Sequence, residues 1–179
     1  MVLTDAELLD RARQGDADGL IRAYADDVYR TAYRVLGDAD LAADATQDAF
    51  VNAIGGLGRF RGDSSLRTWL LRIAVNAARS IGRRRGRRRG VALEAAATTP
   101  SRGGRIDERT VMRAEVDRAQ RALAKLPEKQ RLCVSLRTQE ELSYAEIGEI
   151  VGCSEAGARV NYHYGIQRLR EVLGDDDGM

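Results

Sequence analysis

The stretch "LSYAEIGEIVGCSEAGARV", which runs from Leu142 to Val160, contains two short apolar-periodic segments, each led by a serine and separated by Gly-Cys. Ser143 and Glu146 have the spacing of a capping box, which predicts a helix over residues 144–151. Ser154 can cap a second, longer helix. Two helices joined by a tight turn predict a helix-turn-helix, whose second helix places its N-terminal side chains against base edges in the major groove of DNA.

The second helix has two faces of different composition. Apolar side chains fall at i, i+4, i+8, i+11 and i+15 from Ala158 to Leu173, which predicts one buried seam. The opposite face near the N-terminus is the candidate for contact with the base edges of duplex DNA. Its residues, with the capping serine, are Ser154, Glu155, Ala156, Arg159, Val160 and His163.

Residues 127–179, which hold this motif, carry six basic and ten acidic side chains. DNA-binding proteins attract phosphate with positive charge, so we expect this part of the chain to bind duplex only weakly by itself. A three-helix bundle that binds protein is the alternative interpretation. The DNA-binding interpretation therefore requires another part of the chain to hold the motif on the duplex.

The rest of the chain has a strongly uneven charge. Residues 1–57 hold five basic and eleven acidic side chains, whereas residues 58–90 hold eleven basic and one acidic. The basic segment ends in "RRRGRRRG", Arg83 to Gly90, a run that repels itself unless an anion such as nucleic-acid phosphate lies against it. A solvated tract that binds nothing is the alternative. The acidic first third would repel DNA and is a candidate surface for a protein partner.

Composition favours an all-α fold. Aromatic residues make up 5% of the 179 residues and there are only two prolines, while Ala, Leu, Arg and Asp are plentiful. We predict two small helical domains joined by a flexible linker. The predicted parts are an N-terminal helical bundle over residues 1–85, a flexible basic, Ala- and Gly-rich linker over 86–106, a C-terminal helix-turn-helix bundle over 107–174 and a frayed tail over 175–179.

Capping residues and glycines divide these domains into helices. In the N-terminal bundle, the predicted helices run from Thr4 to Gly15, from a cap at Asp16 to Gly37, from Asp38 to a stop at Gly55-Gly56, and from Ser64 or Ser65 to Arg85. The C-terminal bundle is expected to begin with a helix over about residues 107–125. Pro127 then lies in the first turn of the next helix.

Several classes of protein are excluded by the sequence. The apolar runs are too short to span a membrane and the N-terminus is too acidic and polar for a signal peptide, so we expect a cytoplasmic protein without membrane insertion. Cys133, Cys153 and a single histidine are too few ligands for a zinc site, so no metal and no cofactor is expected. No Cys-His or paired-carboxylate arrangement indicates catalysis, which disfavours an enzyme.

Three segments resemble the extracytoplasmic-function (ECF) sigma factors, the small two-domain specificity subunits of bacterial RNA polymerase. "FRGDSSLRTWLLRIAVNAARS", Phe60 to Ser80, is similar to their promoter-melting segment, and "VYRTAYRVLGDADLAADATQDAFVNAI" is similar to their polymerase-docking helices. "LPEKQRLCVSLRTQEELSYAEIGEIVGCSEAGARV" resembles their region 4 helix-turn-helix. The resemblance covers nearly the whole chain outside the linker and tail. It implies a protein that binds core RNA polymerase and reads a minus-10-type and a minus-35-type promoter element.

The resemblance places polymerase docking on the third predicted helix. Asp44, Gln47 and Asp48 fall at i, i+3 and i+4 and share one polar face, which suits a basic partner such as the polymerase clamp on which the family docks. A solvated face is the alternative. Ala43 stands where the family usually has Glu, so docking is expected to be weaker or shifted.

The resemblance also places capture of a flipped base of the non-template strand on the loop from residue 60 and on the fourth helix. Such a site needs an apolar surface, hydrogen bonds to a base edge and cations for the backbone. Trp69 shares a stripe with Leu66, Leu70 and Ile73 and is expected in the core. The residues assigned to the single strand are Phe60, Arg61, Ser64, Ser65, Arg72, Asn76, Arg83 and Arg84.

One alternative function is a stand-alone helix-turn-helix regulator, which would bind duplex DNA without docking on polymerase. It predicts a ligand pocket or phosphoacceptor in the first block, and the sequence shows neither. The partners that the resemblance implies are core RNA polymerase and promoter DNA in duplex and single-stranded form. Members of the family are commonly held inactive by an anti-sigma factor, so such a protein is a further expected partner.

Overall fold

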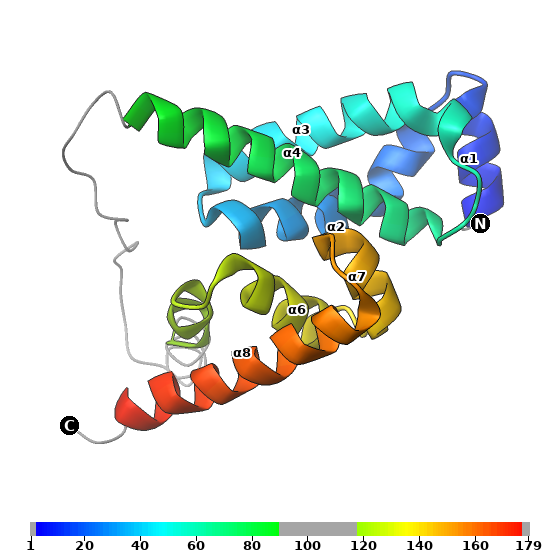
Figure 1. The fold of residues 1–179 in the computed structure, drawn as a ribbon. Helices are drawn as coiled ribbons and strands as arrows, with labels where there is room; N and C mark the ends of the chain where they lie inside the picture. The colour runs from blue at the N-terminus through cyan, green and yellow to red at the C-terminus, as the bar shows by residue number, and fades with distance from the viewer. Residues whose placement is uncertain (1–2, 90–117, 177–179) are drawn as a thin grey trace, which may run out of the picture.

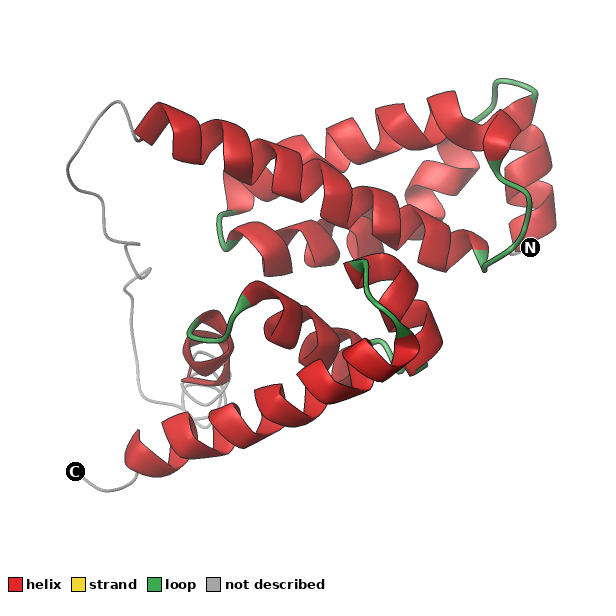
Figure 2. Ribbon diagram, in the orientation of Figure 1, coloured by secondary structure: helices red, strands yellow, loops and turns green. Residues whose placement is uncertain are grey.

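The computed structural model describes residues 3–89 and 118–176, and these residues form helices and loops without a strand (Figures 1 and 2). The helices make two groups, which we call the first group (residues 3–89) and the second group (residues 118–176). Figure 1 shows the first group above the second, with the helix ending at Arg89 at the far side from the N-terminus. The prediction of an all-α fold is confirmed.

The first group contains four α-helices and one short 3-10 helix. Thr4 caps the first helix through a capping box with Glu7, as predicted, and Gly37 ends the second in a left-handed conformation (φ 65°). Asp38 caps the third helix by accepting from the backbone of residues 40 and 41. The bounds are α1 Asp5–Arg13, α2 Asp18–Leu36, α3 Ala39–Gly56, η1 Leu57–Arg59 and α4 Leu66–Arg89.

Two predicted boundaries in this group are wrong. Asp16 does not cap α2, because Ala17 occupies the cap position without a side-chain hydrogen bond. The predicted stop at Gly55-Gly56 agrees with the end of α3 at Gly56, which η1 follows directly. The fourth helix passes Arg85 and ends at Arg89, so its last turn occupies the start of the predicted linker. Glycine inside a helix costs about 1 kcal/mol relative to alanine, which packing against neighbouring helices outweighs.

Small residues let α3 approach its neighbours closely. Its alanines at positions 42, 45, 49 and 53 are all buried, and Phe50 fills the space beside them. Leu20 and Val28 of α2 and Leu70 of α4 meet Phe50 in the core of the group. The amphipathic pattern of the sequence therefore produces a compact bundle in which α2, α3 and α4 pack together.

The second group is built around the helix-turn-helix. Residues 118–124 are helical, and the predicted helix over 107–125 otherwise lies outside the described residues. Pro127 is the cap residue that precedes the next helix and not part of its first turn. The helix over residues 144–151 and its capping box are confirmed. The remaining bounds are α6 Glu128–Gln139, α7 Tyr144–Val151 and α8 Glu155–Asp176.

The two groups pack directly against each other. α4 contacts α7, and α2 contacts α6. Leu71 and Val75 of α4 belong to the same buried cluster as Leu132 of α6 and Ile147 and Ile150 of α7. The predicted linker lies outside the described residues apart from its first four. The predicted frayed tail starts two residues too early, because residues 175 and 176 belong to α8, and its remainder from residue 177 lies outside the described residues. None of the helices in the two described segments is long and apolar enough to cross a membrane.

Candidate nucleic-acid interface

The turn of the helix-turn-helix depends on two glycines. Gly152 adopts a left-handed conformation (φ 79°), and the backbone N–H groups of Gly152 and Cys153 both donate to the carbonyl of Gly148. A Cβ on Gly148 would lie 2.7 Å from the carbonyl oxygen of Cys153, closer than any side chain tolerates. Glycine at position 148 therefore lets α7 and α8 approach closely at the turn, whereas a bulkier residue there would force the two helices apart.

The outward face of α8 carries the predicted base-reading residues. Glu155, Ala156, Arg159, Val160 and His163 are all exposed. Arg159 pairs with Glu155 at 3.3 Å, and its guanidinium lies over the ring of Tyr144, 5.1 Å from the centroid. These contacts orient the arginine while leaving its side chain about half exposed. The capping role of Ser154 is confirmed by its hydroxyl, which accepts from the N–H of Gly157.

The opposite face of α8 is seated on α6. Ala158 is fully buried, whereas the other members of the predicted seam, from Tyr162 to Leu173, are half-buried. At Gly165 the two helices come so close that a Cβ would lie 2.6 Å from the Cγ2 of Val134. This close packing fixes which face of α8 points outward.

The predicted single-strand loop is held in place from two sides. The ring of Phe60 packs on Trp69 with their centroids 5.1 Å apart, and both rings are half-buried against the core of the first group. Arg13 of α1 donates to the carbonyl oxygens of Phe60 at 3.0 Å and Leu57 at 3.4 Å. Gly62 supplies a left-handed turn (φ 81°). The expectation that Trp69 belongs to the core holds for one of its faces only.

Beyond the loop, α4 presents polar side chains to solvent. Ser65 caps α4, because its hydroxyl accepts from the N–H of Thr68 at 3.0 Å, and Ser64 lies half-buried beside it. Arg61 in the loop and Arg72 and Asn76 on α4 are exposed. The loop and the exposed face of α4 thus carry an aromatic ring, cations and an amide, in that order along the first group.

Asn76 lines a shallow hollow between α3 and α4. The hollow also contains the polar side chains of Asn52 and Ser80, which sequence reasoning missed. A neighbouring hollow contains Asp44 and Gln47. Both hollows share Asp48 and Arg84, whose carboxylate and guanidinium are 3.1 Å apart. The predicted docking residues and the predicted strand-binding residues therefore adjoin.

The arginine run is partly engaged within the fold. Arg85 donates to Asp38 at 2.7 Å, and this hydrogen bond, with those from the backbone of the cap, lowers the pKa of the Asp38 carboxyl. Arg83 is exposed. The side chains of residues 87–117 are outside the described part of the chain. At least two arginines of the run thus pair with carboxylates of α3 or its cap, partners that a phosphate backbone would have to replace.

Arg13, Asn52 and Ser80 carry no sequence signal that would have identified them. The loop carbonyls that Arg13 binds are 44 and 47 residues away in the chain. Asn52 and Ser80 lie on different helices and meet only because α3 and α4 are antiparallel neighbours (Figure 1). Their positions could be predicted only from knowledge of which helices pack against each other.

The two cysteines are free thiols. Cys133 is buried, and this burial raises the pKa of its thiol to about 12. Cys153 is partly exposed in the turn between α7 and α8. Within the described segments, no three His, Cys, Asp or Glu side chains are grouped so that they could hold a metal ion. Both thiols therefore belong to the packing of the second group.

The sequence matches two protein families, one in each helical group. Residues 20–89 match sigma-70 region 2, and residues 117–169 match sigma-70 region 4. The RNA polymerase sigma-H factor of Pseudomonas aeruginosa is 35% identical over 94% of this chain and 91% of its own length. The ECF RNA polymerase sigma factor SigW of Bacillus subtilis is 30% identical over 93% of this chain and 95% of its own.

Solved structures agree with these matches. The sigma factor RpoE from Bartonella quintana, in complex with the anti-sigma factor NepR, is 26% identical with a TM-score of 0.68, covering 89% of this chain and 97% of that one. CnrH in complex with the cytosolic domain of CnrY has a TM-score of 0.70 at 22% identity, a likeness of fold, over 96% of this chain and 98% of that one. The chain therefore belongs to the sigma-70 family and, within it, to the ECF sigma factors of RNA polymerase.

Proposed function

We propose that the two helical groups divide promoter recognition between them and that this chain directs core RNA polymerase through α3. The outward face of α8 reads a minus-35-type element, and the loop with α4 holds a melted minus-10-type element. The observation that carries the proposal is the loop itself: Phe60 is fixed on Trp69 and by Arg13 just before α4, whose exposed face carries Asn76 two turns beyond Trp69. Such a preformed aromatic and amide surface suits an unstacked base.

Energetics support capture rather than active melting. Extracting a base from a duplex costs a few kcal/mol, and a small domain has few contacts with which to offset that cost. Stacking on an aromatic ring returns about 1–3 kcal/mol, and the cations of Arg61 and Arg72 attract the flanking phosphates. Asn76 can donate to and accept from a base edge. The pocket therefore traps a base that polymerase binding has already helped to expose.

Upstream recognition follows from the exposed end of α8. Arg159 can reach a guanine edge or a phosphate, while Val160 and Ala156 can contact a thymine methyl group. The second group has little positive charge with which to hold duplex DNA. Attachment to polymerase through Asp44, Gln47 and Asp48 supplies the missing affinity by making the second contact intramolecular. The chain then acts by binding, and the polymerase carries out the chemistry.

Two further features complete the proposal. The relative RpoE is described in complex with an anti-sigma factor, and we propose that an anti-sigma factor also binds this chain. Polymerase and promoter DNA are in the cytoplasm, which is where the chain is expected to act. We propose that the first domain ends with α4 at Arg89 and that the second covers the predicted range 107–174.

Co-purification with core polymerase tests this function against the stand-alone regulator. Tagged chain should retain core polymerase from a bacterial lysate and should direct run-off transcription from a cognate promoter when mixed with purified core enzyme. A chain that binds duplex DNA but neither retains core polymerase nor supports initiation would instead be a stand-alone helix-turn-helix regulator.

A further inference from the structure

The N-terminal helix α1 lies beside the predicted single-strand loop. The match to sigma-70 region 2 begins at residue 20, so α1 precedes the matched segment. In Figure 1 the chain leaves α3 through η1 and passes α1 before it enters α4, and α1 contacts η1. The helix is therefore placed to act on the loop.

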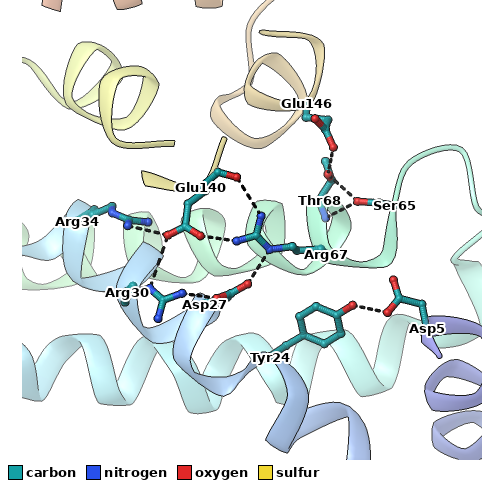
Figure 3. Close-up of polar contacts among 10 residues, drawn as sticks. All are labelled: Asp5, Tyr24, Asp27, Arg30, Arg34, Ser65, Arg67, Thr68, Glu140 and Glu146. Carbon is teal, nitrogen blue, oxygen red and sulfur yellow. Dashed lines mark hydrogen bonds and ion pairs between the residues drawn. The ribbon is translucent and has the colours of Figure 1, made fainter. Parts of the chain in front are cut away.

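Contacts in the first turn and the middle of α1 fix it on the first group. The Asp5 carboxylate accepts from the hydroxyl of Tyr24 on α2 at 2.6 Å, as Figure 3 shows. Burial and the Asp5 carboxylate raise the pKa of this hydroxyl, so it remains a donor. Leu8 and Ala12 are buried in the core of the group. A Cβ at Gly19 of α2 would lie 3.1 Å from Cδ2 of Leu8, so the two helices approach closely.

Arg13, in the last turn of α1, connects the helix to the loop backbone. Its Nη2 donates to the carbonyl oxygen of Phe60 at 3.0 Å and to that of Leu57 at 3.4 Å. Leu57 is the C-cap residue of α3, and Phe60 is that of η1. The last carbonyls of a helix lack partners within the helix and carry partial negative charge, which favours a cation there. Arg13 therefore satisfies carbonyls at the point where the loop begins.

The loop is thereby fixed at both ends. At its start, the ring of Phe60 packs on Trp69. At its end, the hydroxyl of Ser65 accepts from the N–H of Thr68 at 3.0 Å and lies 2.8 Å from the hydroxyl of the same residue (Figure 3). Within the described part of the chain, Arg13 is the only side chain of another helix that hydrogen-bonds to carbonyls of this loop. Loss of Arg13 would free the start of the loop and leave the cap of α4 intact.

The position of the Phe60 carbonyl matters for the two side chains proposed to meet the strand. Phe60 offers its ring to an unstacked base, and the exposed Arg61 is the next residue along the chain. Rotation of the backbone at this point would displace both side chains together. A loop that must be ordered during binding loses affinity, whereas a loop fixed in advance does not. The contact from Arg13 therefore reduces the cost of binding the strand.

A direct contact between Arg13 and a phosphate of the strand is the competing interpretation, because Arg13 is exposed. The geometry favours positioning, since Nη2 is directed at two carbonyl oxygens of the protein itself. The two roles also differ in salt dependence. A lost phosphate contact lowers the salt slope of binding by about one, and a lost positioning contact leaves the slope unchanged.

We propose that α1 holds the single-strand loop in place and that Arg13 is a positioning residue for base capture, acting through the carbonyls of Leu57 and Phe60. The inference rests on the proposed sigma function for its consequence at the promoter, although the fixing of the loop does not. The helix thus contributes to promoter opening without touching the DNA, because it keeps the Phe60 ring and Arg61 where an exposed base and its phosphate can meet them.

Fluorescence of Trp69 measures the position of the loop in the free chain, because Trp69 is the only tryptophan of the 179 residues. Arg13→Ala should raise the acrylamide quenching constant, since the ring of Phe60 covers part of the indole while the loop is held. Arg11→Ala is the matched control, because it removes the same charge from an exposed position on the same helix. Arg13→Lys keeps a cation with donors and should restore part of the wild-type value. Circular dichroism should show unchanged helix content in all three variants.

A second arm measures promoter opening with core polymerase. Arg13→Ala should leave the upstream footprint unchanged and lower the permanganate reactivity of downstream thymines about three- to tenfold, the loss expected for hydrogen bonds from a charged donor. Opening by this variant should also depend less on the identity of the captured base than opening by the wild type. The salt slope of complex formation should stay at the wild-type value, and Arg11→Ala should match the wild type throughout.

Each contrary result has a definite meaning. Wild-type quenching in Arg13→Ala would overturn the role of α1 in fixing the loop. Raised quenching with normal opening and normal base preference would overturn the positioning role. A salt slope lower by about one would assign Arg13 to a direct phosphate contact and would overturn positioning as well. If the wild type binds no core polymerase, the proposed function is wrong and the promoter part of this inference fails with it, while quenching still decides whether α1 fixes the loop.

Discussion

At the scale of single residues, the two proposed DNA sites depend on side chains that are exposed yet held in position. Arg159 is restrained by Glu155 and by the ring of Tyr144, and Phe60 is restrained by Trp69. Restraint before binding lowers the conformational entropy lost on contact with DNA. Both sites are therefore accessible to a nucleic acid, and their side chains lose little conformational entropy when it binds.

Arg159→Ala should weaken recognition of the upstream element by about 1–3 kcal/mol, because a base or phosphate contact is lost. His163→Ala should have a smaller effect, since the imidazole lies farther from the N-terminus of α8 and is positioned for the backbone. Binding to core polymerase should not change in either variant. Footprinting of the upstream element measures the effect, and full protection by both variants would place the recognition face elsewhere.

Helical spacing in the sequence was enough to predict which of these side chains are exposed. Arg72 and Asn76 are four residues apart, and both face solvent as expected. Spacing could not reveal that Arg13 holds the loop, because that contact depends on how α1 packs against η1. The charge of the arginine run and the family resemblance assigned Arg84 to DNA without showing the ion pair that Arg84 makes with Asp48. Long-range polar contacts of this kind leave no periodic signal.

At the scale of helices, the sequence predicted starts better than ends. Thr4, Asp38, Ser143 and Ser154 all cap helices because each side chain supplies an acceptor to backbone N–H groups that lack a partner. Glycines were less reliable stop signals. Gly37 ends α2 and the predicted Gly55-Gly56 stop agrees with the end of α3 at Gly56, but Gly86 lies inside α4. Whether a glycine ends a helix depends on the packing of the following residues, which local sequence does not contain.

Gly148→Ala tests the close turn of the helix-turn-helix. The added methyl group would meet backbone atoms of Cys153 and Ser154, so the variant should lose about 1–3 kcal/mol of stability. Gly55→Ala is the matched control, because nothing lies within 4 Å of its Cβ position and the change should stabilise α3 by about 0.5–1 kcal/mol. Thermal unfolding followed by circular dichroism measures both. A Gly148 variant as stable as the wild type would contradict the proposed tightness of the turn.

At the scale of the whole molecule, the proposed interaction surface has an acidic part on α3 and a basic part on α4, and the two parts adjoin. The acidic face of α3 is proposed for a protein, and the neighbouring face of α4 is proposed for DNA. The pair of Asp48 and Arg84 lies where the two meet. Docking on polymerase and capture of the single strand would therefore occur side by side on the first group.

Asp44→Lys should abolish association with core polymerase without unfolding the chain, because Asp44 is exposed on α3. Asp16→Lys, an exposed change of the same charge in the turn before α2, is the matched control and should bind normally. Pull-down affinity, alongside circular dichroism, measures the effect. Equal affinity in the two variants would remove α3 from the docking surface.

The packing of the two groups against each other could not be predicted from the sequence. Arg67 and Glu140, which form an ion pair between the groups, are 73 residues apart, and neither belongs to a motif that the spacing of residues reveals. Leu71 and Val75 of α4 lie in the buried cluster that extends into the second group, a contact that no local pattern in the sequence indicated. Division of the chain into two helical units was predictable from composition. Their closed arrangement depends on specific partners far apart in the chain.

Permanganate reactivity of promoter thymines tests the division of labour between the two groups most directly. With core polymerase and wild-type chain, thymines of the downstream element should become reactive, because the strand is open and held. Asn76→Ala with Phe60→Ala should leave the upstream footprint nearly normal while abolishing this reactivity, and a pre-melted promoter should restore opening only in part. Normal reactivity and transcription by the double variant on linear duplex would contradict the assignment of strand capture to the loop and α4.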